Sequence, residues 1–217
     1  VDLSGAKNAA GAFWPPAAIV GDVATQRTLP RSLRLDGMAE SLKSGIIGDP
    51  ALWALVETRG KAALRKDEAA RYAIIDRSVQ LKLDVVDRDP FERGERRTLN
   101  LGHTLGHALE IESGYRLPHG KAVVLGLRAV AHMAAGRGAA PGLAERIDEV
   151  VAGLGYELTR TFDAAAVKRA LTTDKQRIKG RQRWILPMDI GTVVDVDDIS
   201  EAELDAAIAH ISAGGTR

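Results

Sequence analysis

Three of the five histidines in this 217-residue chain lie within the segment 103–119, at His103, His107 and His119. On a helix, residues four apart share one face, and Glu110, three residues after His107, falls on that face as well. A catalytic zinc ion takes three nitrogen or oxygen ligands from the protein and keeps a fourth position open. The spacing therefore predicts a metal site, to which a tight return of the chain brings His119 from the start of the next helix.

A simpler interpretation of the same spacing is that the histidines are core or surface residues whose polar atoms are satisfied by neighbours. The presence of a third histidine favours the metal site. The pattern differs from that of the zinc metalloproteases, because Thr104 stands where their motif requires a glutamate base. Peptide hydrolysis is therefore disfavoured.

The residues near the histidines indicate an anionic, polyhydroxylated substrate. Arg96, Arg97 and Asn100 precede His103 by one or two helical turns, and Lys82 lies earlier, on a long predicted helix. Guanidinium, ammonium and amide groups bind phosphate and carboxylate oxygens. Alternatively, the two arginines of "ERGERR" belong to a solvated face, so the evidence is their grouping around three histidines.

Composition excludes several classes of protein. The chain is 45% hydrophobic and 27% charged, which suits one globular domain with a buried core. Its 30 Lys and Arg against 29 Asp and Glu give a net charge of +1, so we expect a small-molecule partner rather than nucleic acid or membrane. The lack of cysteine excludes thiolate chemistry and fits the cytoplasm. No apolar run approaches the roughly 20 residues of a membrane span, and the first residues lack a signal-peptide profile.

The hydrophobic pattern predicts a mainly α fold: a multi-helical domain with one small β-hairpin and an N-terminal strand over 17–22. We expect Thr28 to cap a helix that starts at Leu29–Pro30 and closes near Gly45, and Asp49–Pro50 to start another. Further helices are predicted over 67–89, 99–110, 120–136, 142–154, 163–171 and 200–212. Ser200 and Glu203 are placed as a capping box. The hairpin strands are "RQRWILP" and "GTVVDVD", on either side of "MDI".

Five blocks of sequence resemble the 3-dehydroquinate synthase family of sugar-phosphate cyclases. They are "GAKNAAGAFWPP", "TLPRSLRLDGMAESLKSG", "ERRTLNLGHTLGHALE", "LPHGKAVVLGL" and "DKQRIKGRQRWILPMDIG", in the order and at the spacing found in that family. The resemblance covers nearly the whole chain.

The resemblance implies a role for each of several residues. It implies that Glu40, His103 and His119 are the ligands of Zn²⁺, with Co²⁺ as a possible substitute. Spacing alone does not select Glu40, whose simpler interpretation is an i,i+3 ion pair with Lys43. The resemblance also implies that His107, Lys43 and Asn100 act in catalysis, with His107 as the candidate for proton transfer. The implied substrate-binding residues are Lys7, Asn8, Lys82, Arg96 and Lys175.

The implied reaction converts 3-deoxy-arabino-heptulosonate 7-phosphate to 3-dehydroquinate and phosphate, in the shikimate pathway. NAD oxidises a ring hydroxyl, phosphate leaves by β-elimination, the ketone is reduced again, and the opened ring closes as a carbocycle. The metal lowers the pKa of the hydroxyl that is oxidised. The family also implies a homodimer in the cytoplasm.

The resemblance fails at one point, because the family carries an N-terminal α/β domain that binds NAD. No G-x-G-x-x-G follows a predicted strand in these 217 residues. We therefore interpret residues 1–22 as the end of that NAD-binding domain and 23–217 as the helical metal- and substrate-binding domain. We expect this chain by itself to be inactive.

Three other functions fit the sequence less well. Cyclases of aminoglycoside and cyclitol biosynthesis share the metal ligands but tend to differ where Asn100 and His107 stand. Iron-type alcohol dehydrogenases leave the "AESLK" and "DKQRIKG" blocks unexplained. A non-catalytic helical binding module need not keep Glu40, Lys82 and Arg96 together.

Overall fold

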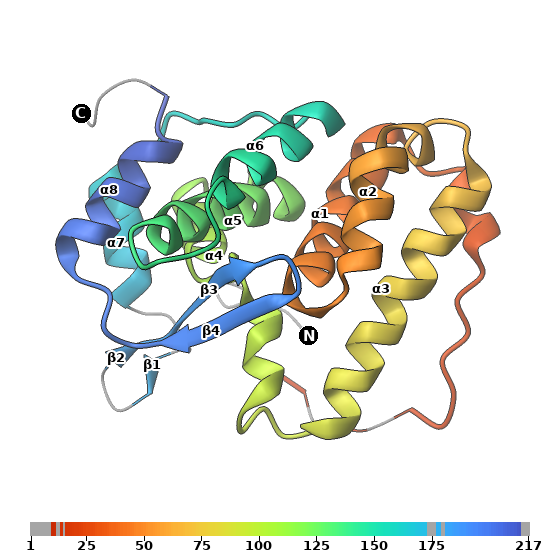
Figure 1. Cartoon of the computed structure of the whole chain (residues 1–217), viewed down its shortest axis with the longest axis horizontal. Helices are drawn as coiled ribbons and strands as arrows, with labels where there is room; N and C mark the ends of the chain where they lie inside the picture. Colours follow the sequence, from red (N-terminus) through yellow and green to blue (C-terminus); the bar gives the residue numbers. More distant parts are fainter. Residues whose placement is uncertain (1–9, 12–13, 15, 173–176, 179–180, 214–217) are drawn as a thin grey trace.

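The computed structural model describes residues 10–11, 14, 16–172, 177–178 and 181–213, and this part of the chain is mainly helical, as predicted (Figure 1). The helices are η1 (Val23–Arg27), α1 (Arg31–Gly48), α2 (Pro50–Ala63), α3 (Glu68–Arg88), η2 (Glu95–Asn100), α4 (His103–Glu112), α5 (His119–Ala135), α6 (Leu143–Leu154), α7 (Ala164–Thr172) and α8 (Glu201–Ile211). The strands are β1 (Arg177–Ile178), β2 (Arg181–Gln182), β3 (Trp184–Asp189) and β4 (Thr192–Val196). No helix among the described residues is long and apolar enough to cross a membrane.

Side chains of the sequence fix where several helices begin. Asp49 Oδ1 accepts a hydrogen bond from Leu52 N at 2.9 Å at the start of α2, and Pro50 occupies its first turn. Ser200 and Glu203 form the predicted capping box at the start of α8. The predicted cap at Thr28 is wrong: Thr28 ends η1, and α1 begins after Pro30 without a side-chain cap.

The predicted hairpin is present as the antiparallel pair β3–β4, with Ile185 opposite Asp195 and Leu186 opposite Val194. β1 and β2 form a second, shorter antiparallel pair. The strand predicted over 17–22 is not formed: these residues are exposed and irregular. A strand needs a neighbour to pair its backbone groups, and the described part of the chain offers none there.

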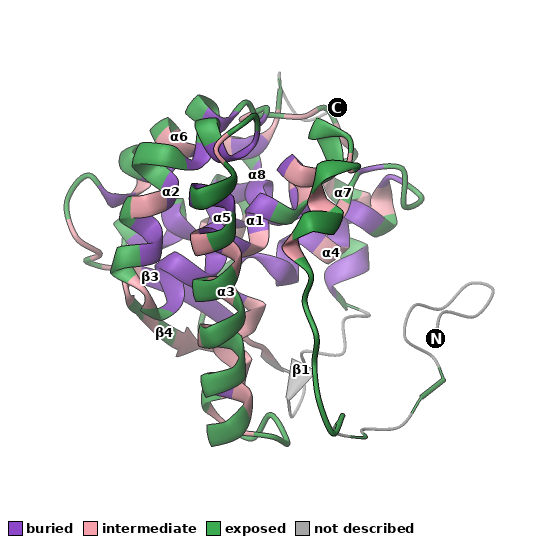
Figure 2. Cartoon of the chain, turned by 90° about the vertical axis from the view of Figure 1, so that its right-hand side faces the viewer, coloured by how far each residue is buried: buried purple, intermediate pink, exposed green. Residues whose placement is uncertain are grey.

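The core lies between two groups of helices. Figure 1 shows α1–α3 on one side and α4–α8 on the other, with the β3–β4 hairpin reaching from one group to the other. α5 is buried along most of its length, whereas the outer face of α3 is exposed (Figure 2). The start of α4 and the middle of α5 pack so closely that a Cβ atom at Gly126 would overlap the carbonyl oxygen of Gly102. This contact joins the two helices that carry His103, His107 and His119.

Candidate metal and substrate site

The predicted helix over 99–110 is interrupted just before the first histidine. η2 ends at Asn100, Gly102 has a φ of +74°, and α4 starts at His103. A Cβ atom at Gly102 would lie 2.9 Å from the backbone nitrogen of Leu127 and would also force a side chain into the left-handed region. The close approach to α5 therefore explains the break, and Asn100 and His103 lie on different elements.

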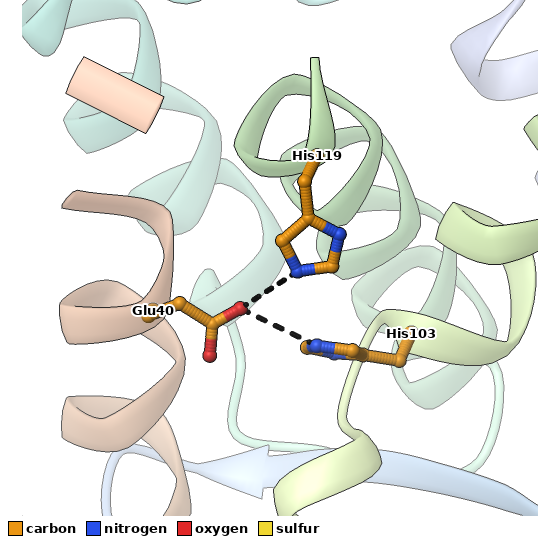
Figure 3. Close-up of side chains that lie close together, drawn as sticks. All are labelled: Glu40, His103 and His119. Atoms are coloured by element: carbon orange, nitrogen blue, oxygen red, sulfur yellow. Dashed lines mark hydrogen bonds and ion pairs between the residues drawn. The ribbon is translucent and has the colours of Figure 1, made fainter. Parts of the chain in front are cut away.

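Three helices bring together the three residues that the resemblance selected as metal ligands. Glu40 comes from α1, His103 from the first residue of α4, and His119 from the first residue of α5 (Figure 3). Glu40 Oε1 lies 3.3 Å from His103 Nε2 and 3.2 Å from His119 Nε2. One ligand atom from each residue falls within 4.8 Å of the others. One carboxylate and two imidazoles therefore face a common point.

The second nitrogen of each of these two histidines faces a different acceptor. His103 Nδ1 is 3.1 Å from the carbonyl oxygen of Leu101, and His119 Nδ1 is 3.3 Å from Glu110 Oε2. Both rings therefore present Nε2 to Glu40.

A close contact between α1 and α5 sets the distance from Glu40 to His119. The Gly120 amide donates a hydrogen bond to Asp36 Oδ1 at 2.6 Å, and a Cβ atom at Gly120 would overlap the backbone carbonyl of Asp36. Glycine at position 120 therefore permits the first turn of α5 to reach α1.

Charge is concentrated at this point. Lys43 is 6% exposed, and its Nζ lies 2.6 Å from Glu40 Oε2, so the i,i+3 pair exists beside the histidine contacts. Burial lowers the pKa of Lys43, although the Glu40 carboxylate opposes this effect. Burial by itself would raise the pKa of Glu40, but hydrogen bonds from His103 and His119 and the charge of Lys43 together lower it.

Glu110 and Glu40, in that order, raise the pKa of His119 to about 9 through their hydrogen bonds. The two carboxylates thus favour positive charge at His119, which is the electrostatic preference that a cation site requires.

His107 lies beside the two histidines of this group. Its ring centroid is 5.3 Å from that of His103 and 6.1 Å from that of His119. His107, Glu110 and His119 form a second set whose ligand atoms fall within 4.8 Å of one another. The predicted sharing of one face by His103, His107 and Glu110 is therefore consistent with these distances.

An open cavity of about 670 Å³ adjoins the Glu40–histidine group. Its lining combines side chains from α1, α3 and the segment before α4: Glu40, Lys43, Ser44, Ser78, Val79, Lys82, Glu92, Arg96, Leu99, Asn100, His103 and His119. Three cations and two carboxylates thus line a space large enough for a small molecule. Lys43, Lys82, Arg96 and Asn100, selected from the sequence, all lie on it.

The segment 89–100, between α3 and α4, is held by one carboxylate. Asp89 accepts hydrogen bonds from the backbone nitrogens of Arg93 at 2.9 Å, Gly94 at 2.7 Å and Arg96 at 3.1 Å. Glu92, inside this turn, has a φ of +55°, which is uncommon for a residue with a side chain. The turn aims both Glu92 and Arg96 at the cavity.

Sequence reasoning missed Glu92. Its Oε1 accepts a hydrogen bond from Asn100 Nδ2 at 2.9 Å, and both residues line the cavity. The charged, glycine-containing segment around it was the available signal, but spacing gives no reason to choose this acid over Glu95.

Of the other residues selected from the sequence, Arg97 points away from the cavity: its Nε donates to Asp195 Oδ2 on β4 at 2.9 Å. The predicted residues Lys7, Asn8 and Lys175 lie outside the described residues.

Comparison with known proteins gives one family. Residues 37–177 match the model of the family described as "3-dehydroquinate synthase C-terminal". The chain is 41% identical over 214 residues to a 3-dehydroquinate synthase of Xanthomonas campestris pv. campestris, covering 93% of this chain and 57% of that protein. It is 38% identical over 222 residues to a 3-dehydroquinate synthase of Xylella fastidiosa (strain M12), covering 97% of this chain and 59% of that protein. The chain thus spans less than two thirds of the length of these relatives.

Two solved structures have the same fold. A 2-epi-5-epi-valiolone synthase from Streptomyces hygroscopicus subsp. jinggangensis 5008, with NAD⁺ and Zn²⁺ bound, matches with a TM-score of 0.86 at 25% identity, over 94% of this chain and 58% of that one. A 2-deoxy-scyllo-inosose synthase, complexed with carbaglucose-6-phosphate, NAD⁺ and Co²⁺, matches with a TM-score of 0.79 at 19% identity, over 96% of this chain and 60% of that one. At the lower identity the likeness concerns the fold alone.

Proposed function

The chain belongs to the 3-dehydroquinate synthase family, and from this we propose that it is the metal- and substrate-binding part of a 3-dehydroquinate synthase. The substrate is 3-deoxy-arabino-heptulosonate 7-phosphate, and the products are 3-dehydroquinate and phosphate. NAD⁺ is held by a further part of the enzyme, so this chain alone does not turn over. In this proposal the enzyme acts in the cytoplasm as a homodimer, without nucleic acid or membrane as a partner.

The donor set of Glu40, His103 and His119 fits Zn²⁺, which accepts nitrogen and oxygen ligands and needs three from the protein at a catalytic site. Co²⁺ accepts the same ligands. When bound, such an ion supplies Lewis-acid chemistry, which lowers the pKa of a substrate hydroxyl and favours its oxidation. The solved 2-epi-5-epi-valiolone synthase, which has NAD⁺ and Zn²⁺ bound, supports this cofactor pair.

The cations that line the cavity provide the means to bind an anionic sugar phosphate. Lys43 from α1, Lys82 from α3 and Arg96 from the segment before α4 approach the cavity from three directions. Because these three cations stand on different elements, they can bind the two ends of a substrate that carries a carboxylate at one end and a phosphate at the other, and so fix its orientation. We propose that Lys7, Asn8 and Lys175 complete this binding set.

Polar groups beside the cavity and the metal ligands can assist proton transfer. Asn100 donates to Glu92 Oε1 at 2.9 Å, which holds this carboxylate at the cavity. His107 lies beside His103 and His119, and an imidazole changes its charge near neutral pH. We propose that His107, with Lys43 and Asn100, supports the proton transfers of the reaction while remaining outside the metal ligand set.

One observation carries the proposal: a carboxylate and two imidazoles converge at the edge of a cavity lined by three cations. A cyclase for a different sugar phosphate is the second candidate, because the valiolone synthase shares the fold with a TM-score of 0.86. The higher identity to 3-dehydroquinate synthases, 38–41%, favours the first candidate.

The first test is the intact mass of the natural protein, compared with the 23.2 kDa of this chain. A mass larger by about one ordinary domain, roughly 15 kDa, is expected, and that protein should release phosphate from the heptulosonate phosphate when NAD⁺ and Zn²⁺ are supplied. The 217-residue chain should bind Zn²⁺ but release no phosphate. Phosphate release by this chain at an enzymatic rate would overturn its proposed dependence on a further part. Turnover of a cyclitol precursor in place of the heptulosonate phosphate would favour the second candidate.

A further inference from the structure

We infer that Glu110 is a positioning residue for His119: its carboxylate accepts the Nδ1 proton and so directs Nε2 toward Glu40. This inference rests on the proposed metal site and gives a role to a residue outside its ligand set. Glu110 is 5% exposed, and its Oε2 lies 3.3 Å from His119 Nδ1. A charged group at that burial requires a partner, and the imidazole N–H is one.

The neighbouring histidine supports this interpretation independently. His103 Nδ1 faces the carbonyl oxygen of Leu101 at 3.1 Å. A carbonyl oxygen can only accept a hydrogen bond, so Nδ1 of His103 carries a proton, and Nε2, which faces Glu40, is the nitrogen available to an ion there. An ionised carboxylate imposes the same choice on His119. Two different acceptors therefore orient two histidines in the same way, each with Nε2 toward Glu40.

The second set of possible ligands, His107, Glu110 and His119, offers a different role for Glu110. In that set Glu110 would itself bind the ion together with a nitrogen of His119. The hydrogen bond between Glu110 and His119 uses Nδ1, whereas the cavity side of the ring presents Nε2 to Glu40. Glu40, His103 and His119 line the cavity, and Glu110 is buried behind them. The geometry thus favours Glu110 as a hydrogen-bond partner of the ligand His119, outside the metal ligands, rather than as a ligand itself.

The turn between α4 and α5 maintains the contact. Ser113, which is buried, donates from Oγ to the carbonyl oxygen of Glu110 at 2.8 Å and accepts from Leu117 N at 3.0 Å. These bonds fix the path from the end of α4 to His119. The backbone positions from which Glu110 and His119 approach one another are therefore held by the turn.

The test compares Glu110→Gln with Glu112→Gln in the 217-residue chain, by titrating Zn²⁺ against a competing chelator. Removal of an outer partner of a ligating histidine typically weakens metal binding about 10–100-fold, and we expect a loss of that size for Glu110→Gln. Glu112 is the matched control: it lies on the same helix, but its Oε1 accepts from Asp163 N at 3.1 Å. We expect its affinity to match that of the unmodified chain.

A second measurement needs no variant and therefore holds even if Glu110→Gln does not fold. Nitrogen-15 NMR of the zinc-loaded, unmodified chain should show that His119 keeps its proton on Nδ1 and binds through Nε2. Binding through Nδ1, or equal affinities of a folded Glu110→Gln variant and the unmodified chain, would overturn the inference while leaving the metal site intact. If the unmodified chain binds no Zn²⁺, the proposed metal site fails, and the inference fails with it.

Discussion

Two pairs of histidine rings, His103 with His119 and His132 with His210, differ in the charged groups that contact them. His103 and His119, from α4 and α5, have ring centroids 5.2 Å apart. His132 and His210, from α5 and α8, stack with centroids 4.5 Å apart and an interplanar angle of 10°. Ring spacing alone would make either pair a candidate metal site, so the groups around each pair must decide.

Carboxylates contact the first pair. Glu40 lies within 3.3 Å of both rings, and Glu110 contacts the far nitrogen of His119. Their negative charge favours a proton or a metal ion at this position.

An arginine contacts the second pair. Arg128 is 4% exposed, and its Nη2 lies 3.0 Å from His210 Nε2. The nearby carboxylate of Asp148 is already paired with Arg128, at 2.6 Å. Burial, followed by the charges of Arg128 and His132, lowers the pKa of His210. Asp148 Oδ2, 3.7 Å from His210 Nε2, opposes this effect without reversing it. We infer that neighbouring charge, rather than histidine spacing, marks the first pair and not the second as the candidate metal site.

Replacement of a histidine from each pair should give the largest contrast. We expect His103→Ala to reduce Zn²⁺ affinity by more than the roughly 100-fold limit typical of outer-partner changes, because it removes a direct ligand. We expect His132→Ala to bind Zn²⁺ as the unmodified chain does. Metal content after gel filtration and chelator competition measure both. Unchanged metal content in His103→Ala would refute the ligand assignment.

The contact between α1 and α5 provides the second test. Gly120→Ala places a Cβ atom against the backbone carbonyl of Asp36, so α5 must move and carry His119 away from Glu40. We expect weaker Zn²⁺ binding and a loss of about 1–3 kcal/mol in the free energy of unfolding, as for other overpacked sites.

The matched control for this change is Gly37→Ala on α1, where a Cβ atom meets nothing within 4 Å. It should leave Zn²⁺ binding unchanged and stabilise the helix by about 0.5–1 kcal/mol. Equal Zn²⁺ affinities for the two variants would show that the approach of α5 to α1 does not set the site. Urea unfolding and chelator competition provide the two readouts.

The pH dependence of zinc binding tests the charge of the first pair. The pKa of His119 is raised to about 9 in the metal-free chain, so at neutral pH a zinc ion must displace a proton from it. Apparent affinity should therefore rise about tenfold per pH unit from neutral pH and level off above pH 9. Calorimetric titration in buffers of different ionisation enthalpy should show about one proton released from His119. A pH-independent affinity over this interval would contradict the predicted charge.

Features that depend on local spacing could be predicted from the sequence. The caps at Asp49 and Ser200 follow from residues next to the helices that they start, and both are observed. The grouping of His103 with His107 follows from a separation of four residues on one helix. These features need no knowledge of the rest of the chain.

Features that depend on contacts between distant segments could not be derived from spacing. Glu40 is separated from His103 by α2, α3 and η2 and was selected by family resemblance alone. The break at Gly102 depends on the approach of α5. Glu92 reaches the cavity because Asp89 holds the turn around it. In each case the information lies in tertiary packing.

The smallest expected effect is a change in stability at acid pH caused by the second pair. A histidine whose pKa is lowered on folding contributes stability that is present above its unfolded value of about 6.5 and is lost as the pH falls through its folded pKa. We expect His210→Gln to flatten this acid loss, because a glutamine oxygen can still accept from Arg128 but does not titrate. Urea unfolding of the metal-free chain between about pH 5 and 7.5 measures the effect, with His132→Gln for comparison. An identical pH slope for His210→Gln and the unmodified chain would mean that burial and the charge of Arg128 do not lower the pKa of His210. The contrast between the two pairs would then rest on the first pair alone.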